Sequence, residues 1–223
     1  MTLVKKVSII AAHPDDETIG MGGTISRMTN SGHEVSVLIL SDGVSAREQL
    51  RETGASRKAA SKAALDKLGV HEIDFLNFPD NKFDSTPLLE IVREIEVFLD
   101  KHTPDYVFSN YSHDLNVDHQ ITASATLTAC RPTAGRSIRG VFQYQTLSST
   151  EWNFGAEKFS PSLYVDISDT LSKKLAALNE YQAELNPFPH PRSIVAIEAL
   201  ATLVGSECGY QRAESFVQKY LLI

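Results

Sequence analysis

Short runs of apolar residues alternate along the chain with longer segments in which apolar residues recur at helical spacing. The apolar runs predict β-strands at residues 4–11, 34–40, 73–76, 105–109 and 141–146. The helical spacing predicts helices at residues 24–28, 55–68, 88–99, 121–130 and 171–184. Because strands and helices alternate, the pattern predicts a single-domain α/β fold, a Rossmann-like, doubly wound, mostly parallel sheet with helices on both faces.

Two clusters of polar residues directly follow predicted strands. The first cluster is His13-Pro14-Asp15-Asp16-Glu17, after the apolar run 7–11, and the second is His113-Asp114-Leu115-Asn116-Val117-Asp118-His119, after the run 106–108. Open α/β sheets hold their ligands at the carboxyl ends of the strands. Two clusters of metal-type ligands at such positions indicate one metal-dependent hydrolytic site.

Two other interpretations of the first cluster are weaker. Acidic residues near a helix start can cap the helix or interact with its dipole, but this explains neither His13 nor the second cluster. The glycines Gly20, Gly22 and Gly23 suggest a dinucleotide-binding loop. Such a loop needs its first glycine close behind the strand, whereas here three acids intervene that would repel phosphate. The glycines are therefore expected to allow close packing of the first helix on the sheet.

The spacing of the polar residues indicates a ligand set. His13 and Asp16 are close enough in sequence for one turn to direct both side chains to one centre, and His119 supplies the third ligand. Two histidines and one carboxylate match catalytic zinc, which keeps an open position, and the same set suits iron(II). Asp15 is then placed to act as general base toward water activated by the metal.

At these residues the chain resembles the PIG-L/LmbE-like family of zinc-dependent N-acetylglucosaminyl deacetylases. Members remove acetyl groups from N-acetyl sugars on lipid, thiol-conjugate or nucleotide-linked carriers. The resemblance implies zinc ligands at His13, Asp16 and His119 and a general base at Asp15. It also covers most of the first 130 residues, so the family's fold is implied as well.

The resemblance extends to two further residues. Arg57 fits the family's arginine that contacts sugar hydroxyls or a neighbouring anionic group, and Asp80 sits where a carboxylate for a substrate hydroxyl is expected. A solvated helix arginine and an Asp-Asn turn are equally good explanations of these two residues.

The chain departs from the family pattern at Asn116, where many members have a histidine that stabilises the oxyanion. An amide NH2 can donate to an oxyanion but cannot act as an acid. The proton donor is then a protonated Asp15, His113 or the distant His190. The pairing of His190 with Arg192 in a proline-bounded loop suggests an anionic substrate group, and a solvated loop is an equal alternative. Trp152 either packs, the commoner role, or stacks on a sugar ring.

Composition limits the class of protein. The chain has 223 residues, a formal net charge of −7 and a pI near 5.5, which argues against a nucleic-acid partner. It contains no apolar run of about 18 residues, and its start reads as a strand, so neither an integral membrane segment nor a signal peptide is expected. Cys130 and Cys208 are expected to be reduced thiols of a cytoplasmic protein, and a homo-oligomer is compatible with the sequence.

These features together predict a hydrolase that removes the N-acetyl group of a GlcNAc-type amino sugar on a nucleotide, lipid or polysaccharide-precursor carrier. One domain is expected over residues 1–223, with the core sheet and metal site in 1–147 and C-terminal helices and substrate-side loops in 148–223. The nearer alternative is an amidase of the same scaffold acting on a thiol conjugate or another N-acyl amide. The more distant alternative is a non-catalytic sugar-binding protein.

Overall fold

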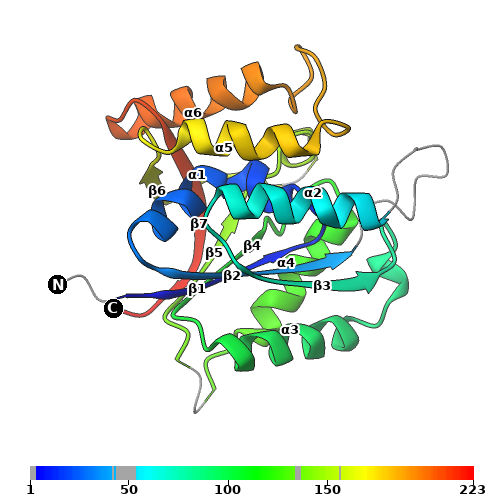
Figure 1. Ribbon diagram of the computed structural model, residues 1–223. Helices are drawn as coiled ribbons and strands as arrows, with labels where there is room; N and C mark the ends of the chain where they lie inside the picture. The colour runs from blue at the N-terminus through cyan, green and yellow to red at the C-terminus, as the bar shows by residue number, and fades with distance from the viewer. Residues whose placement is uncertain (1–3, 42, 44–53, 134–136, 156) are drawn as a thin grey trace.

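The computed structural model describes residues 4–41, 43, 54–133, 137–155 and 157–223. They form one seven-stranded sheet in the order β3-β2-β1-β4-β5-β7-β6 (Figure 1). The strands are β1 (Lys6–Ala11), β2 (Glu34–Ser41), β3 (Glu72–Phe78), β4 (Tyr106–Asn110), β5 (Gly140–Tyr144), β6 (Leu163–Asp166) and β7 (Ala213–Leu221). The first five strands pair in parallel, and β7 runs antiparallel to both β5 and β6. The predicted single-domain α/β fold with a mostly parallel sheet is confirmed.

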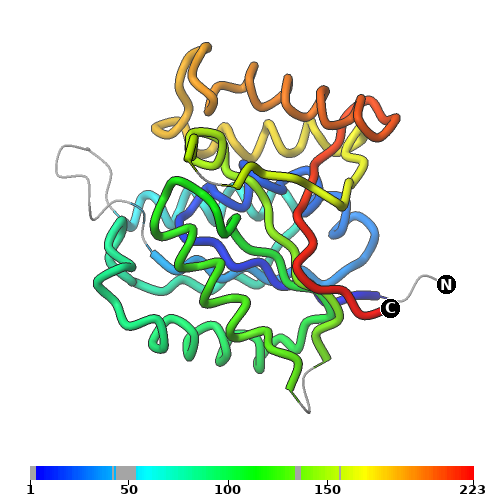
Figure 2. The backbone as a smooth tube through the Cα atoms, turned by 180° about the vertical axis from the view of Figure 1, so that it is seen from behind, coloured from blue at the N-terminus to red at the C-terminus, as the bar shows by residue number. Residues whose placement is uncertain are grey.

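Helices cover both faces of this sheet. They are α1 (Asp16–Asn30), α2 (Gly54–Lys67), α3 (Leu88–His102), α4 (Val117–Ala129), α5 (Leu171–Leu178) and α6 (Ile194–Cys208), with 3-10 turns η1 (Phe83–Ser85), η2 (Thr150–Trp152) and η3 (Asn179–Tyr181). Alternate residues of β1 enter opposite cores, because side chains of a strand alternate between its faces. Ile9 packs under α1 and α2, whereas Ile10 packs against α3 and α4. In Figure 2, α5 and α6 form a further layer outside α1.

The C-terminal part of the chain differs from the sequence-based expectation. β6 and β7 belong to the main sheet, so the expectation that the core sheet lies within residues 1–147 is wrong. Both strands and α6 were not predicted. Only the first part of β7 is buried, and its pairing partners are distant in sequence, so a local pattern gives a weak signal. The predicted helix 171–184 ends earlier, at Leu178, and continues as η3.

Helix α1 approaches the sheet closely and is bent. It begins at Asp16, well before the predicted residue 24, and Met21 has non-helical angles (φ −147°, ψ 20°). A Cβ on Gly20 would lie 2.3 Å from the Tyr144 ring, and one on Gly23 would lie 2.7 Å from the Ile167 side chain. The prediction of close packing on the sheet is confirmed for Gly20. Gly23 instead packs against Ile167, which follows β6, and Gly22 lies against Lys174 of α5.

The bend in α1 leaves backbone donors that a buried ion pair satisfies. Glu214 of β7 accepts hydrogen bonds from the backbone N–H of Gly23 (3.0 Å) and of Thr24 (2.7 Å). Lys174 of α5 donates to the same carboxylate (2.5 Å) and to the carbonyl of Ile19 (2.7 Å). The C-terminal elements therefore hold the helix that begins at the first polar cluster. Within the described parts of the chain, no helix combines the length and apolar character that a bilayer crossing requires.

Candidate metal centre and active site

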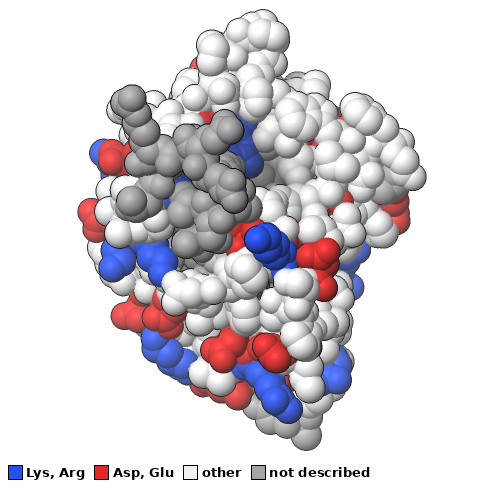
Figure 3. All heavy atoms as spheres, turned by 90° about the vertical axis from the view of Figure 1, so that its right-hand side faces the viewer, with Lys and Arg blue, Asp and Glu red and all other residues white. Residues whose placement is uncertain are grey.

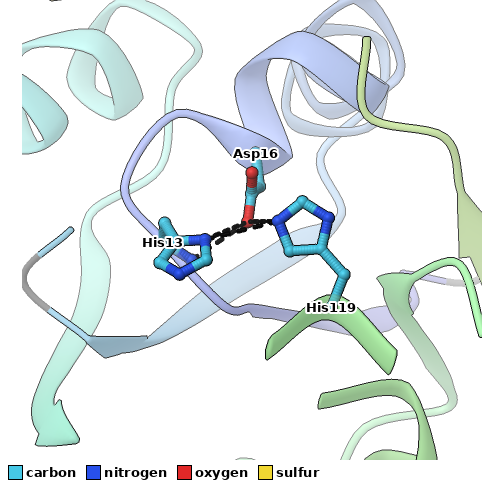
Figure 4. Close-up of side chains that lie close together, drawn as sticks. All are labelled: His13, Asp16 and His119. Carbon is cyan, nitrogen blue, oxygen red and sulfur yellow. Dashed lines mark hydrogen bonds and ion pairs between the residues drawn. The ribbon is translucent and has the colours of Figure 1, made fainter. Parts of the chain in front are cut away.

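The two polar clusters meet at the carboxyl edge of the sheet. β1 and β4 are parallel neighbours, so the turn after β1 and the loop after β4 lie side by side. His13 and Asp16 come from the turn into α1, and His119 comes from the first turn of α4 (Figure 4). Asp16 Oδ2 lies 3.2 Å from His119 Nε2 and 3.5 Å from His13 Nδ1, and the two ring nitrogens are 3.3 Å apart. The structure brings the three predicted ligands together.

This triangle of atoms fits a metal ion. Ligand bonds of about 2.0–2.1 Å in tetrahedral geometry place neighbouring ligand atoms roughly 3.3–3.4 Å apart. The three side chains are buried, and Asp16 Oδ1 has no hydrogen-bond partner among the described residues. A buried oxygen without a partner is costly unless something else binds it. Imidazole and carboxylate donors suit zinc and other first-row divalent ions.

Three buried carboxylates surround the outer nitrogens of the histidines. His13 Nε2 lies 3.0 Å from Asp118 Oδ2 and 3.2 Å from Asp80 Oδ1, and His119 Nδ1 lies 3.2 Å from Asp114 Oδ1. Carboxylates in such positions fix the ring tautomer, so that the opposite nitrogen presents its lone pair to a metal. The sequence analysis did not assign Asp114 or Asp118 this function. The only available signal was their position inside the second cluster.

The charges at this place favour a cation. Burial would lower the pKa of His13, but hydrogen bonds to Asp118 and Asp16 raise it well above its usual value. Burial likewise opposes the charged form of His119, yet Asp16 and Asp114 raise its pKa to about 9. For Asp16, burial acts to raise the pKa, but both rings hold it well below the usual range. A divalent cation supplies the same positive charge and competes with these ring protons.

Asp15 occupies the position expected of a base beside the ligands. Its backbone is in the left-handed region (φ 109°), which is uncommon for a residue other than glycine and typical of functional sites. It precedes α1 but makes no side-chain capping bond, so capping does not explain it. Arg57 Nη2 (3.1 Å) and Arg192 Nη1 (3.0 Å) donate to Oδ2, while Oδ1 is buried without a partner among the described residues. Burial raises the pKa of Asp15, and the charges of Arg192 and Arg57 oppose that rise.

A small cavity of about 40 Å³ lies beside these groups. Apart from Gly43, every described residue of its wall is polar. These residues are His13, Asp15, Arg57, Asp80, Asn81, Asn116, His119 and Arg192. Figure 3 views the molecule from the side on which the parallel strands end, where uncharged residues form most of the upper part and charged ones are mixed below. The cavity thus brings two of the three predicted ligands and the predicted base together with three of the four predicted substrate-binding residues.

The two predicted arginines share a buried network. Arg57 binds Glu184 and the carbonyl of Pro14 (2.9 Å) in addition to Asp15. Arg192 Nη1 also donates to Glu184 (3.1 Å), and its Nε donates to Ser148 (2.6 Å). This arrangement holds Asp15 between two guanidinium groups. Arg57 is buried, so the alternative of a solvated helix arginine is wrong. Contact of either arginine with substrate stays a prediction.

Asn116 caps a helix in addition to its predicted function as a donor to the oxyanion. It is the N-cap of α4, and its Oδ1 accepts from the backbone N–H of Asp118 (2.8 Å). Its Nδ2 donates to Asn81 Oδ1 (3.2 Å) and lies on the cavity side, since both residues line the cavity. An amide has two N–H donors, so the second is able to serve a ligand.

His113 and His190, the two histidines considered as proton donors, do not belong to the described wall of the cavity. His113 is 42% exposed at its side chain, lies 3.5 Å from Glu157, and is absent from the described wall of the cavity. His190 Nδ1 accepts from the backbone N–H of Arg192 (3.0 Å), so it supports the loop that carries this arginine. The catalytic function assigned to His113 and the substrate contact assigned to His190 remain predictions.

A buried site of two histidines and a carboxylate, with a second carboxylate beside it, at the carboxyl edge of an α/β sheet is typical of metal-dependent hydrolases. Within that class, the chain belongs to the PIG-L family, described as GlcNAc-PI de-N-acetylase, which it matches over residues 8–130. It is 28% identical to diacetylchitobiose deacetylase of Thermococcus kodakarensis, with 95% of this chain and 82% of the relative covered.

Two solved structures share the fold. N,N'-diacetylchitobiose deacetylase from Pyrococcus horikoshii, in complex with an inhibitor, superposes with a TM-score of 0.79 at 24% identity, covering 97% of this chain and 84% of that one. The 4-carboxy-2-hydroxymuconate hydratase of Pseudomonas putida superposes with a TM-score of 0.78 at 18% identity, covering 99% and 98%. One fold therefore serves different reactions, and the reaction of this chain has to be argued from its site.

Proposed function

We propose that this protein is a zinc-dependent N-deacetylase of N-acetylglucosamine-type amino sugars, with iron(II) as the alternative metal. The observation that carries the proposal is the triangle of His13, Asp16 and His119 next to the unpartnered oxygen of Asp15. Membership of the PIG-L family and the similarity to diacetylchitobiose deacetylase support the same reaction.

The reaction is amide hydrolysis, in which the oxygen of water bonds to the acetyl carbon and the C–N bond breaks. A divalent metal held by His13, Asp16 and His119 would act as a Lewis acid and lower the pKa of water. Asp15 Oδ1 accepts the proton of the attacking water, while Arg57 and Arg192 hold Oδ2. Asn116 Nδ2 donates to the developing oxyanion. Asp15 then returns the proton to the leaving nitrogen, which gives acetate and a free amine.

The cavity favours a small acyl group over a long one. Its volume of about 40 Å³ is far below the range of about 300–1,000 Å³ that is usual for ligand pockets. Its described wall is polar, so an extended acyl chain would leave buried polar groups without partners. Acetyl and the hydroxyl groups of a sugar suit this wall better than the larger N-acyl amide of the alternative amidase. A purely sugar-binding protein would have no need of the unpartnered oxygen of Asp15 beside three metal-type ligands.

Acetate release from a panel of N-acetyl sugars tests the proposal. The panel contains free N-acetylglucosamine, N,N'-diacetylchitobiose, a nucleotide-linked N-acetylglucosamine and a lipid-linked one. We expect acetate release from at least one of them, loss of the activity with a chelator, and recovery with added zinc or iron(II). Hydration of an unsaturated acid without release of acetate from any sugar would contradict the proposal and favour the chemistry of the hydratase.

A further inference from the structure

Residues 148–151, which follow β5 in the chain, form a turn that contacts both halves of the candidate active site; we call it the 148–151 turn. Its shape is fixed from within, because the Glu151 carboxylate accepts from the backbone N–H of Ser148 (2.6 Å) and of Ser149 (3.3 Å). Ser148 has a left-handed backbone (φ 68°), which is uncommon for a residue other than glycine. The turn therefore has a defined conformation, in which neighbouring side chains serve different partners.

One side of the turn holds the carboxylate that lies behind the proposed ligand His119. Ser149 Oγ and Thr150 Oγ1 donate to the two oxygens of Asp114, and Asp114 Oδ1 lies 3.2 Å from His119 Nδ1. Asp114, Ser149 and Thr150 are all buried. A buried carboxylate needs donors, and a carboxylate on the outer nitrogen of a ligand histidine sets the orientation of the ring. The position of His119 therefore depends on the two hydroxyl groups of the turn.

The other side of the turn holds an arginine of the proposed base. Ser148 Oγ accepts from Arg192 Nε (2.6 Å), and the carbonyl of Leu147 lies 3.4 Å from the same nitrogen. Arg192 Nη1 in turn donates to Asp15 Oδ2 (3.0 Å). Two consecutive serines thus connect to the two halves of the site. Ser149 reaches the metal ligand through a carboxylate, and Ser148 reaches the base through a guanidinium.

We propose that the 148–151 turn is a positioning element that ties the metal ligand His119 to the general base Asp15. This inference rests on the proposed deacetylase function and adds positioning residues to the same site. Attack by water requires the metal and the base to lie at a fixed separation, and an error of about 1 Å in such a geometry can cost about 10²-fold in rate. His119 and Asp15 come from different elements, so a segment that contacts the partners of both stabilises their relative position.

Zinc affinity tests the ligand side of the turn and needs no substrate. Zinc is transferred at equilibrium from the loaded protein to a chromophoric chelator. Ser149→Ala should weaken zinc binding roughly three- to tenfold, since it removes a hydrogen bond to a charged group. Asp114→Ala should weaken it by roughly 10–100-fold, the scale for the direct partner of a ligand. Ser148→Ala is the matched control at the neighbouring position and should bind zinc like the wild type.

The rate at saturating zinc tests the base side. Ser148→Ala should lower kcat roughly two- to tenfold with little change in KM, because the guanidinium that holds Asp15 loses one hydrogen bond. Ser36→Ala is the control for loss of a buried serine. The Ser36 hydroxyl is hydrogen-bonded to that of Ser8 (2.9 Å) near the amino end of β2, away from the site, so neither zinc affinity nor kcat should change.

A conservative substitution separates the hydroxyl group from simple packing. Thr150→Ser keeps the donor to Asp114, so its zinc affinity should equal that of the wild type, whereas Thr150→Val should lose affinity as Ser149→Ala does. Urea unfolding of each variant shows whether it is folded, and Thr150→Val replaces Ser149→Ala if the latter does not fold. Loss of zinc affinity in Thr150→Ser would overturn the proposal.

Two further results would also overturn it. Unchanged zinc affinity in Ser149→Ala, or an equal loss in Ser148→Ala, would show that the turn does not act on His119 through Asp114. Unchanged kcat in Ser148→Ala would show that the turn does not act on Asp15.

The failure of this proposal is distinguishable from the failure of the proposed function. Acetate release together with wild-type zinc affinity in Ser149→Ala would leave the deacetylase function standing and remove the positioning element. Weaker zinc binding in Ser149→Ala without acetate release from any sugar would keep the link to His119. It would remove the deacetylase function and with it the link to the base.

Discussion

Asp15 and Asp16 are neighbours with the same side chain and different environments. Asp16 Oδ2 lies within 3.5 Å of two histidine nitrogens and accepts from the backbone of His13 (3.0 Å), so it has the surroundings of a ligand. Asp15 is turned the other way by its left-handed backbone and lies against Arg57 and Arg192. The two carboxylates can therefore perform different tasks one residue apart.

Two substitutions of Asn116 should separate its effect on folding stability from its effect on catalysis. Asn116→Ala removes the cap of α4 and the amide donor, so we expect a loss of about 1 kcal/mol in unfolding free energy. The same variant should lose about 10²–10³ in kcat, the scale for one oxyanion donor. Asn116→Ser keeps a capping oxygen but lacks the amide, so urea unfolding should recover while kcat stays low. Full activity of Asn116→Ala would show that the oxyanion is held by another group.

At the scale of elements, the course of α1 positions Asp16, one of the three proposed metal ligands. Its first residue is Asp16, and its course is set by close contact with Tyr144 of β5 and by the Glu214–Lys174 pair at its bend. Removing one partner of such a buried ion pair strongly destabilises the fold, because the other charge stays buried without compensation. The C-terminal elements therefore support the site although they contribute no proposed metal ligand.

Two glycines of α1 should respond differently to the same substitution. Gly20→Ala would place a Cβ 2.3 Å from the Tyr144 ring and 2.8 Å from the carbonyl of Gln145, so overpacking should cost about 1–3 kcal/mol. In Gly22→Ala the tightest contact of the new Cβ is Lys174 Cγ, at 3.1 Å, and the helix gains propensity, so the unfolding free energy should stay within about 1 kcal/mol of the wild type. Equal destabilisation in urea would mean that the Tyr144 contact does not position α1.

At the scale of the whole molecule, the sequence predicted the parallel half of the fold and the grouping of His13, Asp16 and His119. The buried strands β1, β2 and β4 read as apolar runs, and the three proposed ligands follow β1 and β4 at the edge where parallel strands end. The rest depends on contacts between distant residues. Arg57 and Glu184 are 127 residues apart, and β7 lies between β5 and β6, two strands that are distant from it in sequence. No local pattern contains such information.

In the proposed active site, His13, Asp16 and His119 hold a catalytic metal while Asp15 acts as base. The most direct test measures metal content per chain and acetate release on the same samples of Asp15→Asn and Asp16→Asn. We predict that Asp15→Asn keeps about one zinc or iron per chain and loses at least roughly a hundredfold in kcat, whereas Asp16→Asn loses most of the metal. Full metal content in Asp16→Asn together with loss of metal in Asp15→Asn would contradict this assignment of ligand and base.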